Sequence, residues 1–242
     1  MQLWDQESEL VSNMALPNFF FEKNYWKKDF LVIGVDEVGR GALAGPVVSA
    51  AVAFLPPKLK TKFPDWETVD FSAVGINDSK KLTSRKRGYF SKLIKRHSLC
   101  WGIGETSPGL IDSRGIVWAT QKSMRQAVKN AQRRLKYRLG GKYWQINSFL
   151  LIDAFHVKYV PGIGLKNQKP IIKGDEKSIS IAAASIIAKV YRDDLMSKLS
   201  CSFGRWKLYG WEKNKGYGTK SHKIAIKNHG ISRQHRKSFC GL

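Results

Sequence analysis

The stretch FLVIGVDEVGRGALAGP occupies residues 30–46 and joins an apolar run to a glycine-rich turn. Residues 30–35 form an apolar run that is followed by Gly and Pro residues. This pattern is typical of a short buried strand. Asp36 and Glu37 follow where that strand is expected to end. Adjacent carboxylates repel, and burial disfavours both charges. A divalent cation would make the pair tolerable, because Mg²⁺ takes oxygen ligands from carboxylates, phosphate and water.

An ordinary charged surface turn is the alternative explanation for an Asp-Glu pair. The residues that follow argue against it. Gly39 and Gly41 allow the backbone to approach a ligand closely, and Arg40 places a guanidinium between them. Taken together, residues 36–46 favour a ligand-binding turn.

The rest of the chain mixes strand-like and helix-like segments. Further strands are predicted at 47–55, 99–105, 149–153 and 170–173, and helices at 83–97, 113–139, 178–199 and 221–228. Thr83 is expected to cap its helix, Gly115 weakens the first turn of the long basic helix, and the helix from Ser178 has an amphipathic pattern with a small-residue face. The mixture predicts an α/β layer architecture.

The chain is strongly basic, with 42 Lys and Arg against 19 Asp and Glu and a net charge of +23. Residues 113–152 contain no acid, yet they hold many basic side chains, of which Lys142 is the last. This excess favours a polyanionic partner, nucleic acid first and an acidic membrane surface second. The longest apolar stretch, 42–55, is interrupted and is shorter than the roughly 20 residues that span a bilayer. No membrane helix is therefore predicted.

Cysteine and histidine spacing exclude two kinds of site. Three cysteines lie far apart in the sequence, which argues against both a disulfide framework and a zinc site and predicts a reducing, cytoplasmic compartment. Cys100, in an apolar segment, is expected to be a core residue. The five histidines show no metal-ligand spacing; His222 and His235 could lie near a bound nucleic acid.

Several further motifs follow residues 36–46 in order. These are 77–82 (NDSKKL), Asp153 after an apolar strand, Asp175 in KGD, the helix 181–190 with Arg192-Asp193, 215–219 (KGYGT) and 235–239 (HRKSF). From about Phe30 to Phe239, the chain resembles the ribonuclease HII family. The resemblance implies a ribonuclease H-like fold, with a mixed central sheet flanked by helices and a C-terminal helical portion. It divides the chain into an extension (1–29), a catalytic core (30–200) and a basic helical segment that completes the same domain (201–242).

The resemblance implies a metal-dependent endoribonuclease. Such an enzyme hydrolyses the RNA strand of RNA–DNA hybrids and cuts 5′ to ribonucleotides embedded in duplex DNA, leaving a 3′-hydroxyl and a 5′-phosphate. The family's metal-binding positions are occupied by Asp36, Glu37, Asp153 and Asp175. They would hold two Mn²⁺ or Mg²⁺ ions about 4 Å apart. A monomer acting in the cytoplasm is expected.

The remaining implied site residues contact the substrate. Gly39, Arg40 and Gly41 would touch the ribose 2′-hydroxyl through backbone groups, and Tyr217 would assist in the same discrimination between RNA and DNA. Asn77, Ser79 and Lys80 resemble a phosphate-contacting loop. Two positions depart from the family pattern: Ala154 stands where Gly is usual, and Gly115 where Asn is usual.

Two alternatives remain beside this reading. Net charge alone is equally compatible with a non-catalytic nucleic-acid-binding protein, for which divalent ions and the four acids would not matter. The sister family, ribonuclease HIII, is disfavoured because it carries a substantial N-terminal domain and differs within the Gly-Arg-Gly element.

Overall fold

A computed structural model describes residues 16–61, 63–64, 67, 69–71, 74–139 and 147–241. Lys142 and residues 1–15 of the predicted extension lie outside these ranges. The centre of the fold is a five-stranded sheet of order β3-β2-β1-β4-β5. The strands are β1 (Leu31–Val38), β2 (Val47–Ala53), β3 (Cys100–Thr106), β4 (Ser148–Asp153) and β5 (Gln168–Ile171). β1 pairs antiparallel with β2 and parallel with β4, so the sheet is mixed as predicted.

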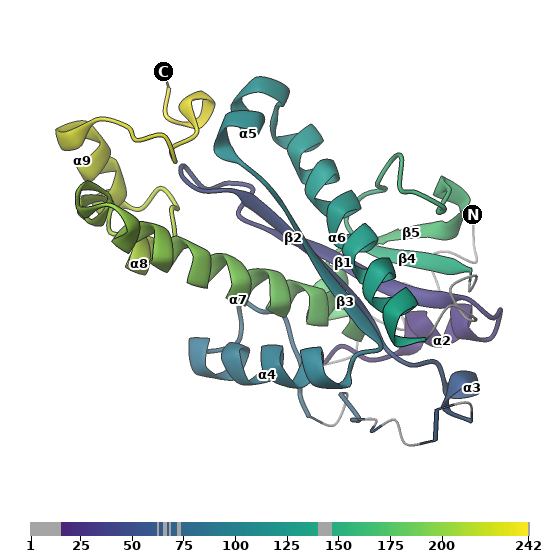
Figure 1. Cartoon of the computed structure of the whole chain (residues 1–242). Coiled ribbons are helices and arrows are strands. Elements are labelled where there is room, and N and C mark those ends of the chain that lie inside the picture. The colour runs from purple at the N-terminus through teal and green to yellow at the C-terminus, as the bar shows by residue number, and fades with distance from the viewer. Residues whose placement is uncertain are drawn as a thin grey trace.

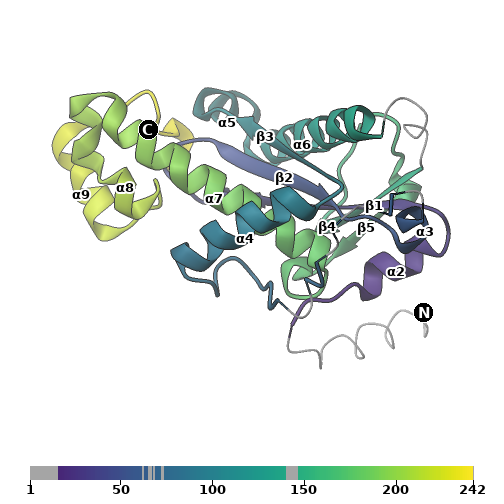
Figure 2. The same cartoon turned by 60° about the horizontal axis from the view of Figure 1, so that its bottom comes forward.

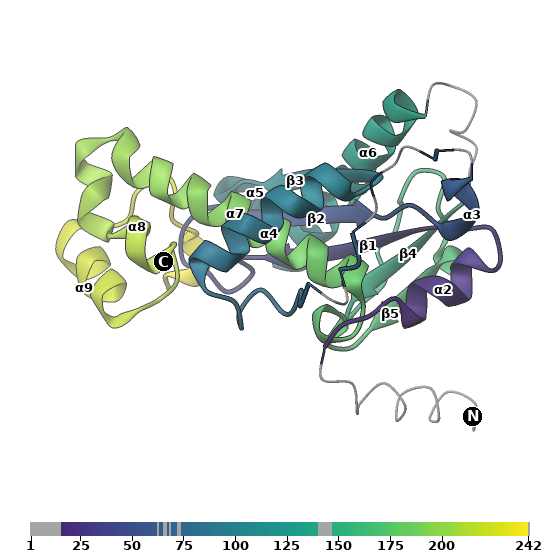
Figure 3. The same ribbon diagram turned by 90° about the horizontal axis from the view of Figure 1, so that it is seen from below.

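Helices cover both faces of the sheet (Figure 1). On one face lies α6 (Ile116–Arg138), and on the other α7 (Ile179–Ser202) with α4 (Ser84–His97). Figure 3 views the second layer directly, with α4 and α7 crossing in front of the strands. Successive side chains of β1 point to opposite faces of the sheet. Ile33 packs in the core beneath α6, and Val32 packs in the core beneath α7.

The first half of α7 is buried on every side. All residues from 179 to 188 are buried, which differs from the amphipathic pattern expected there. Its small residues allow close approach to the sheet, and Gly34 of β1 completes the fit, because a Cβ at that position would lie 2.1 Å from the carbonyl carbon of Ser180. The helix is therefore held in a fixed position over the middle of β1.

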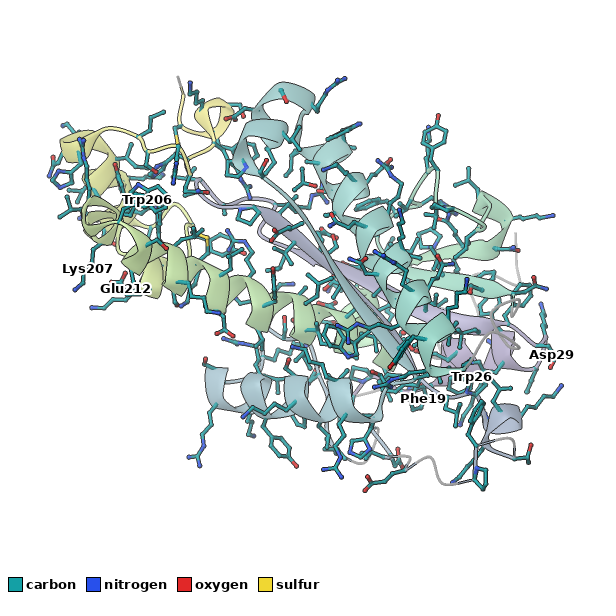
Figure 4. The ribbon with its side chains drawn as sticks, viewed as in Figure 1. Phe19, Trp26, Asp29, Trp206, Lys207 and Glu212 are labelled. Atoms are coloured by element: carbon teal, nitrogen blue, oxygen red, sulfur yellow. The ribbon has the colours of Figure 1, made fainter. Side chains whose placement is uncertain are left out.

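The C-terminal segment forms a helical lobe at one end of the sheet (Figure 2). It contains the end of α7, α8 (Trp211–Asn214) and α9 (Lys220–His229) around a small aromatic core. The other elements are α2 (Phe20–Trp26), α3 (Pro57–Lys60), α5 (Pro108–Arg114) and the 3₁₀ turns η1 (Leu165–Asn167), η2 (Gly174–Glu176), η3 (Gly204–Tyr209) and η4 (Lys237–Phe239). Figure 4 shows Trp206 of this lobe far from Phe19 and Trp26.

Element boundaries differ from the predictions where glycine or tertiary pairing intervenes. The predicted helix 113–139 is broken at Gly115, whose φ of 78° separates α5 from α6. The fifth strand begins at Gln168 instead of Pro170 because its pairing with β4 starts there. Thr83 does cap α4, accepting a hydrogen bond from the Lys86 amide at 3.3 Å.

Two further predictions can be checked directly. Cys100 is buried in the core, and all three cysteines are free thiols. Within the described part of the chain, the structure contains no helix that is both long and apolar enough to span a membrane.

Candidate active site

Strand register brings the first and third of the predicted acids together. The parallel pairing of β1 with β4 ends at Val35 and Ile152, so the next positions, Asp36 and Asp153, are neighbours. Because successive side chains alternate between faces, both acids point away from the α6 core and toward α7. Asp36 is only 5% exposed. β1 continues to Val38 through its pairing with β2, so Asp36 lies inside a strand and not at its end as predicted.

Helix α7 supplies a neighbour for Asp36 that the sequence reading did not identify. Ser185 is buried, and its hydroxyl hydrogen-bonds Asp36 and lowers that carboxyl's pKa. The same hydroxyl lies 2.9 Å from the Ser79 hydroxyl. The serine pair therefore links the 77–82 loop to the helix that backs the site.

The fourth acid, Asp175, reaches the site from turn η2. The amide of Gly174 donates to Asp153 Oδ1 at 2.8 Å, which fixes the start of this turn against the end of β4. Lys80 Nζ lies 3.6 Å from Asp175 Oδ2 and 4.0 Å from Asp78 Oδ1. Asp78 is thus a fifth acid at the site, and it is buried like Asp36 and Asp175. It stands within the quoted motif NDSKKL, which was the signal that could have identified it.

The acids raise one another's pKa values. Burial raises the pKa of Asp36 well above its usual range, and the charges of Glu37 and Asp153 raise it further. Burial raises the pKa of Glu37 to about 7, although Arg40, with Nη1 3.5 Å from Glu37 Oε1, opposes the shift. Burial and the charge of Asp78 also raise the pKa of Asp175. This edge of the sheet is therefore deficient in positive charge.

One oxygen at the site has no partner. Glu37 Oε2 is buried and accepts no hydrogen bond from any residue that the structure describes. An unsatisfied buried carboxylate oxygen is costly unless a cation neutralises it. Among the described residues, no three His, Cys, Asp or Glu side chains already stand at metal-ligand spacing, so the four acids are neighbours and not a preformed coordination shell.

The Gly-Arg-Gly turn and the Tyr217 loop lie side by side. The amide of Leu43 donates to the Gly216 carbonyl at 2.8 Å, and that of Ala44 to the same oxygen at 3.1 Å. The buried guanidinium of Arg192 joins both segments, donating from Nη2 to the Ala44 carbonyl at 3.0 Å and from Nη1 to the Lys215 carbonyl at 2.8 Å. Two loops far apart in the sequence are therefore held as one unit.

Gly39 is required at its position for two reasons. Its φ is 88°, and an added Cβ would lie 2.2 Å from Nε of Arg192. By contrast, Gly41 has open space around it, so nothing in the fold itself demands glycine there. A backbone position with open space around it is suited to close approach by a ligand.

A cavity of about 440 Å³ collects most of the predicted residues. Its lining includes Asp36, Glu37, Gly39, Arg40, Ser79, Lys80, Asp153 and Tyr217, together with Ser185 and Lys189, which sequence reasoning missed. Asn77, Gly41 and Asp175 are not part of the lining. The Asn77 side chain accepts a hydrogen bond from the Asp78 amide at 2.8 Å and so shapes its own loop.

A family model for ribonuclease HII matches residues 33–242. The chain belongs to the ribonuclease HII family. Ribonuclease HII of Bacillus mycoides (strain KBAB4) is 45% identical over 212 residues, covering 87% of this chain and 69% of that protein. The enzyme of Desulfitobacterium hafniense (strain DSM 10664 / DCB-2) is 43% identical over 219 residues, covering 90% and 72%. The chain is accordingly a ribonuclease H hydrolase with endonuclease activity, which excludes the non-catalytic alternative.

Solved structures agree with this fold. Ribonuclease HII of Archaeoglobus fulgidus, determined in a complex with PCNA, matches with a TM-score of 0.56 at 24% identity, covering 86% of this chain and 94% of that one. Bst-RNase HIII in complex with Mn²⁺ matches with a TM-score of 0.58 at 20% identity, covering 88% and 68%. The predicted fold class is confirmed. The family match and the sequence identities confirm the HII assignment over HIII.

Two of the five histidines, His222 and His235, form a hydrogen-bonded network in the C-terminal lobe. His222 Nδ1 donates to the Tyr217 carbonyl at 2.9 Å, and its Nε2 accepts from the Trp211 indole at 3.1 Å. His235 Nδ1 accepts from the Ser232 amide at 2.9 Å, which leaves its Nε2–H to face His222 Nε2 at 3.2 Å. Both rings are buried, so their link to the site is through the position of Tyr217.

Proposed function

We propose that this ribonuclease HII cuts the RNA strand of RNA–DNA hybrids and cuts duplex DNA 5′ to a single embedded ribonucleotide, leaving a 3′-hydroxyl and a 5′-phosphate. The observation that carries the proposal is the shared cavity. Two acids with raised pKa values, the buried Asp36 and the partly buried Glu37, line the same space as Gly39 and Tyr217. Groups suited to phosphate chemistry and groups suited to recognising a sugar thus face one substrate position.

The proposed metal ligands are Asp36, Glu37, Asp153 and Asp175, with Mg²⁺ or Mn²⁺ as the ions. Carboxylate oxygens are the donors that hard divalent ions prefer. Support comes from the unpartnered Glu37 Oε2 and from pKa values raised by burial and mutual repulsion, both of which a cation would relieve. When bound, such ions supply an activated water and stabilise charge on the leaving 3′-oxygen.

Cationic side chains of the site would orient the phosphate. Burial lowers the pKa of Lys80, but the charges of Asp175 and Asp78 outweigh it and raise that pKa, so the ammonium stays charged. Its side chain is 78% exposed, which leaves it free to meet a phosphate oxygen. Lys189 lines the same cavity, with Nζ 2.8 Å from Asp193 Oδ1, and would add positive charge beside the scissile bond.

Backbone groups at Gly39, Arg40 and Gly41 would contact the ribose 2′-hydroxyl, and the Tyr217 ring would pack against the same sugar. Because Arg192 fixes both loops, their separation is set before the substrate binds. A rigid pocket that hydrogen-bonds the ribose 2′-hydroxyl discriminates strongly against deoxyribose, because the polar groups of the pocket are left unpaired when that hydroxyl is missing.

The test is cleavage of three end-labelled duplexes by the purified protein with Mn²⁺, with Mg²⁺ and with EDTA. The duplexes are all-DNA, DNA with one ribonucleotide, and an RNA–DNA hybrid. We expect cuts in the second and third with either ion, a break 5′ to the single ribonucleotide, and no product in EDTA. Equal cutting of the all-DNA duplex would refute the proposed discrimination, and full activity in EDTA would refute the proposed metal dependence.

A further inference from the structure

Residues 16–29 lie outside the family match, yet they are part of the main core. Phe21 and Trp26 of α2 are 6% and 8% exposed. Tyr25 stacks on Phe149 of β4 with ring centroids 3.6 Å apart, and Phe19 packs against Trp26 at 5.2 Å. Figure 4 shows the last pair together. The described part of the extension is therefore fixed relative to the sheet.

The chain before α2 bonds to the segment that carries Asp175. Asn18 and Ser178 form a parallel bridge. The Asn18 amide donates to the Lys177 carbonyl at 3.3 Å, and the Ile179 amide donates to the Asn18 carbonyl at 3.2 Å. These bonds hold the backbone between η2 and α7, two to four residues after the proposed metal ligand.

Glu22 makes a second, independent connection to the same segment. Its side chain is fully buried, and Oε1 accepts hydrogen bonds from the Ser178 hydroxyl at 2.6 Å and the Ser180 amide at 2.9 Å. Ser178 Oγ in turn caps α7 by accepting from the Ile181 amide at 3.3 Å. The carboxylate thus faces the N-terminus of a 24-residue helix, where the helix dipole favours negative charge.

Burying this acid has a cost that the fold must offset. Desolvation raises the pKa of Glu22, against the opposing effect of its bonds to Ser178 and Ser180. Its second oxygen, Oε2, is buried without a hydrogen-bond partner. An apolar residue would avoid this penalty if filling the core were the only requirement. Unlike an apolar residue, Glu22 forms hydrogen bonds to Ser178 and Ser180 at the start of α7.

Turn η2 is consequently held from both sides. On the site side, the Gly174 amide donates to Asp153 Oδ1 at 2.8 Å. On the other side, the Ser178 amide donates to the Gly174 carbonyl at 2.8 Å, and Ser178 is the residue that Asn18 and Glu22 hold. Asp175 lies between these two anchors.

We propose that Asn18 and Glu22 position Asp175 for metal binding by fixing the 174–180 segment against the sheet. Glu22 is a positioning residue, since it contacts neither the substrate cavity nor the other acids. The inference rests on the proposed function, which assigns Asp175 to the metal. It gives the segment before the family domain a part in the active site.

The test compares Mn²⁺ affinity, measured by isothermal titration calorimetry on the full chain, among wild type and the variants Glu22→Ala, Glu22→Gln, Glu22→Asp and Phe21→Leu. Loss of a residue that orients a metal ligand typically weakens affinity about 10- to 100-fold, and we expect a loss of about tenfold for E22A. E22Q keeps the accepting oxygen and should stay near wild type. F21L loosens the same helix but leaves the hydrogen bonds of Glu22 to Ser178 and Ser180 in place, so its thermal stability should fall while its Mn²⁺ affinity is unchanged.

The dependence of the cleavage rate on Mn²⁺ concentration provides the second readout. The Mn²⁺ concentration for half-maximal cleavage should rise in E22A, while the rate at saturating Mn²⁺ recovers. If E22A does not fold, E22D carries the same expectation, because the shorter side chain cannot reach Ser178 and Ser180 together. Wild-type Mn²⁺ affinity in E22A, or in E22D where E22A does not fold, overturns the inference, as does an equal loss in F21L.

Asp175→Asn separates this inference from the proposed function on which it rests. Unchanged Mn²⁺ affinity in D175N would refute the metal assignment of Asp175 itself. A loss in D175N together with wild-type affinity in E22A would refute only the positioning role of Glu22.

Discussion

The acidic edge of the sheet and the C-terminal lobe both bury polar side chains, but they satisfy them differently. At the sheet edge, Glu37 Oε2 has no hydrogen-bond partner among the described residues, and the pKa values of Asp36, Glu37 and Asp175 are raised. In the lobe, the ring nitrogens of His222 and His235 all have partners, and the pKa values of both rings are lowered by burial. At the sheet edge, an unsatisfied oxygen among acids with raised pKa values indicates where a cation would be stabilising, whereas the satisfied ring nitrogens of His222 and His235 form a structural network.

The largest expected effect comes from the unsatisfied region. Asp36→Asn should reduce the cleavage rate at least about a thousandfold, because several kcal/mol of metal-dependent transition-state stabilisation is lost. Without metal it should not lower the melting temperature, since one of several repelling charges is removed. Cleavage assays and thermal melts in EDTA measure both.

The control for this variant is Asp29→Asn, an exposed acid before β1 that Figure 4 places at the end of the sheet away from the C-terminal lobe. It should leave the cleavage rate unchanged. Normal cutting by D36N would contradict the assignment of the site, and a marked loss of stability in EDTA would contradict the contrast between the two regions.

Next in size is disruption of the satisfied network. His222→Ala removes the partners of the Trp211 indole, the His235 ring and the Tyr217 carbonyl, and should destabilise the fold by on the order of 2–4 kcal/mol. Urea unfolding measures the change. His229→Ala, an exposed position on the same helix, should have little effect. Equal stability of the two variants would show that the network contributes nothing measurable.

The two regions should also respond oppositely to pH. Burial and the nearby His222 lower the pKa of His235 to about 4, so the unfolded chain binds more protons between pH 6.5 and 4, and stability is lost as pH falls through that window. The raised pKa of Glu37, about 7 instead of 4.5, has the reverse sign: in metal-free protein its contribution is lost as pH rises from 4.5 to 7.

Melting temperature against pH in EDTA separates these slopes. His235→Asn should flatten the rise in stability from pH 4 to 6.5, and Glu37→Gln should flatten the fall from 4.5 to 7. If His235→Asn left the rise unchanged, or Glu37→Gln left the fall unchanged, the attribution of that slope would be wrong.

The smallest expected effect concerns strain beside the site. Ala154 follows Asp153 with a φ of 66°, a conformation that favours glycine, the residue usual here in the family. Ala154→Gly should gain up to about 1 kcal/mol, after the entropic cost of glycine is subtracted from the relieved strain, and raise the melting temperature by roughly 2–4 °C. Ala188→Gly, within α7, should instead lower it. A lower melting temperature in A154G would show that the strain is not relieved.

Local patterns were sufficient for much of the fold. The apolar run before Asp36 and the small-residue helix after Ser178 were readable from sequence because hydrophobic periodicity and capping act over a few residues. Gly115 was recognised only as a weak point, although it separates two helices. Asp78 was missed as a site residue although it stands in the motif NDSKKL, and Ser185 was missed because nothing in its neighbours in the sequence shows that it lies beside Asp36.

The sequence by itself determined the family and the α/β class and singled out the four acids proposed as metal ligands, because these follow from residue types in a fixed order. Only the tertiary structure decided which groups meet. Parallel register aligns Asp36 with Asp153, Arg192 joins two distant loops, and Glu22 reaches the start of α7 from outside the family domain. These contacts join residues as many as 158 positions apart, over which local sequence preferences carry no information.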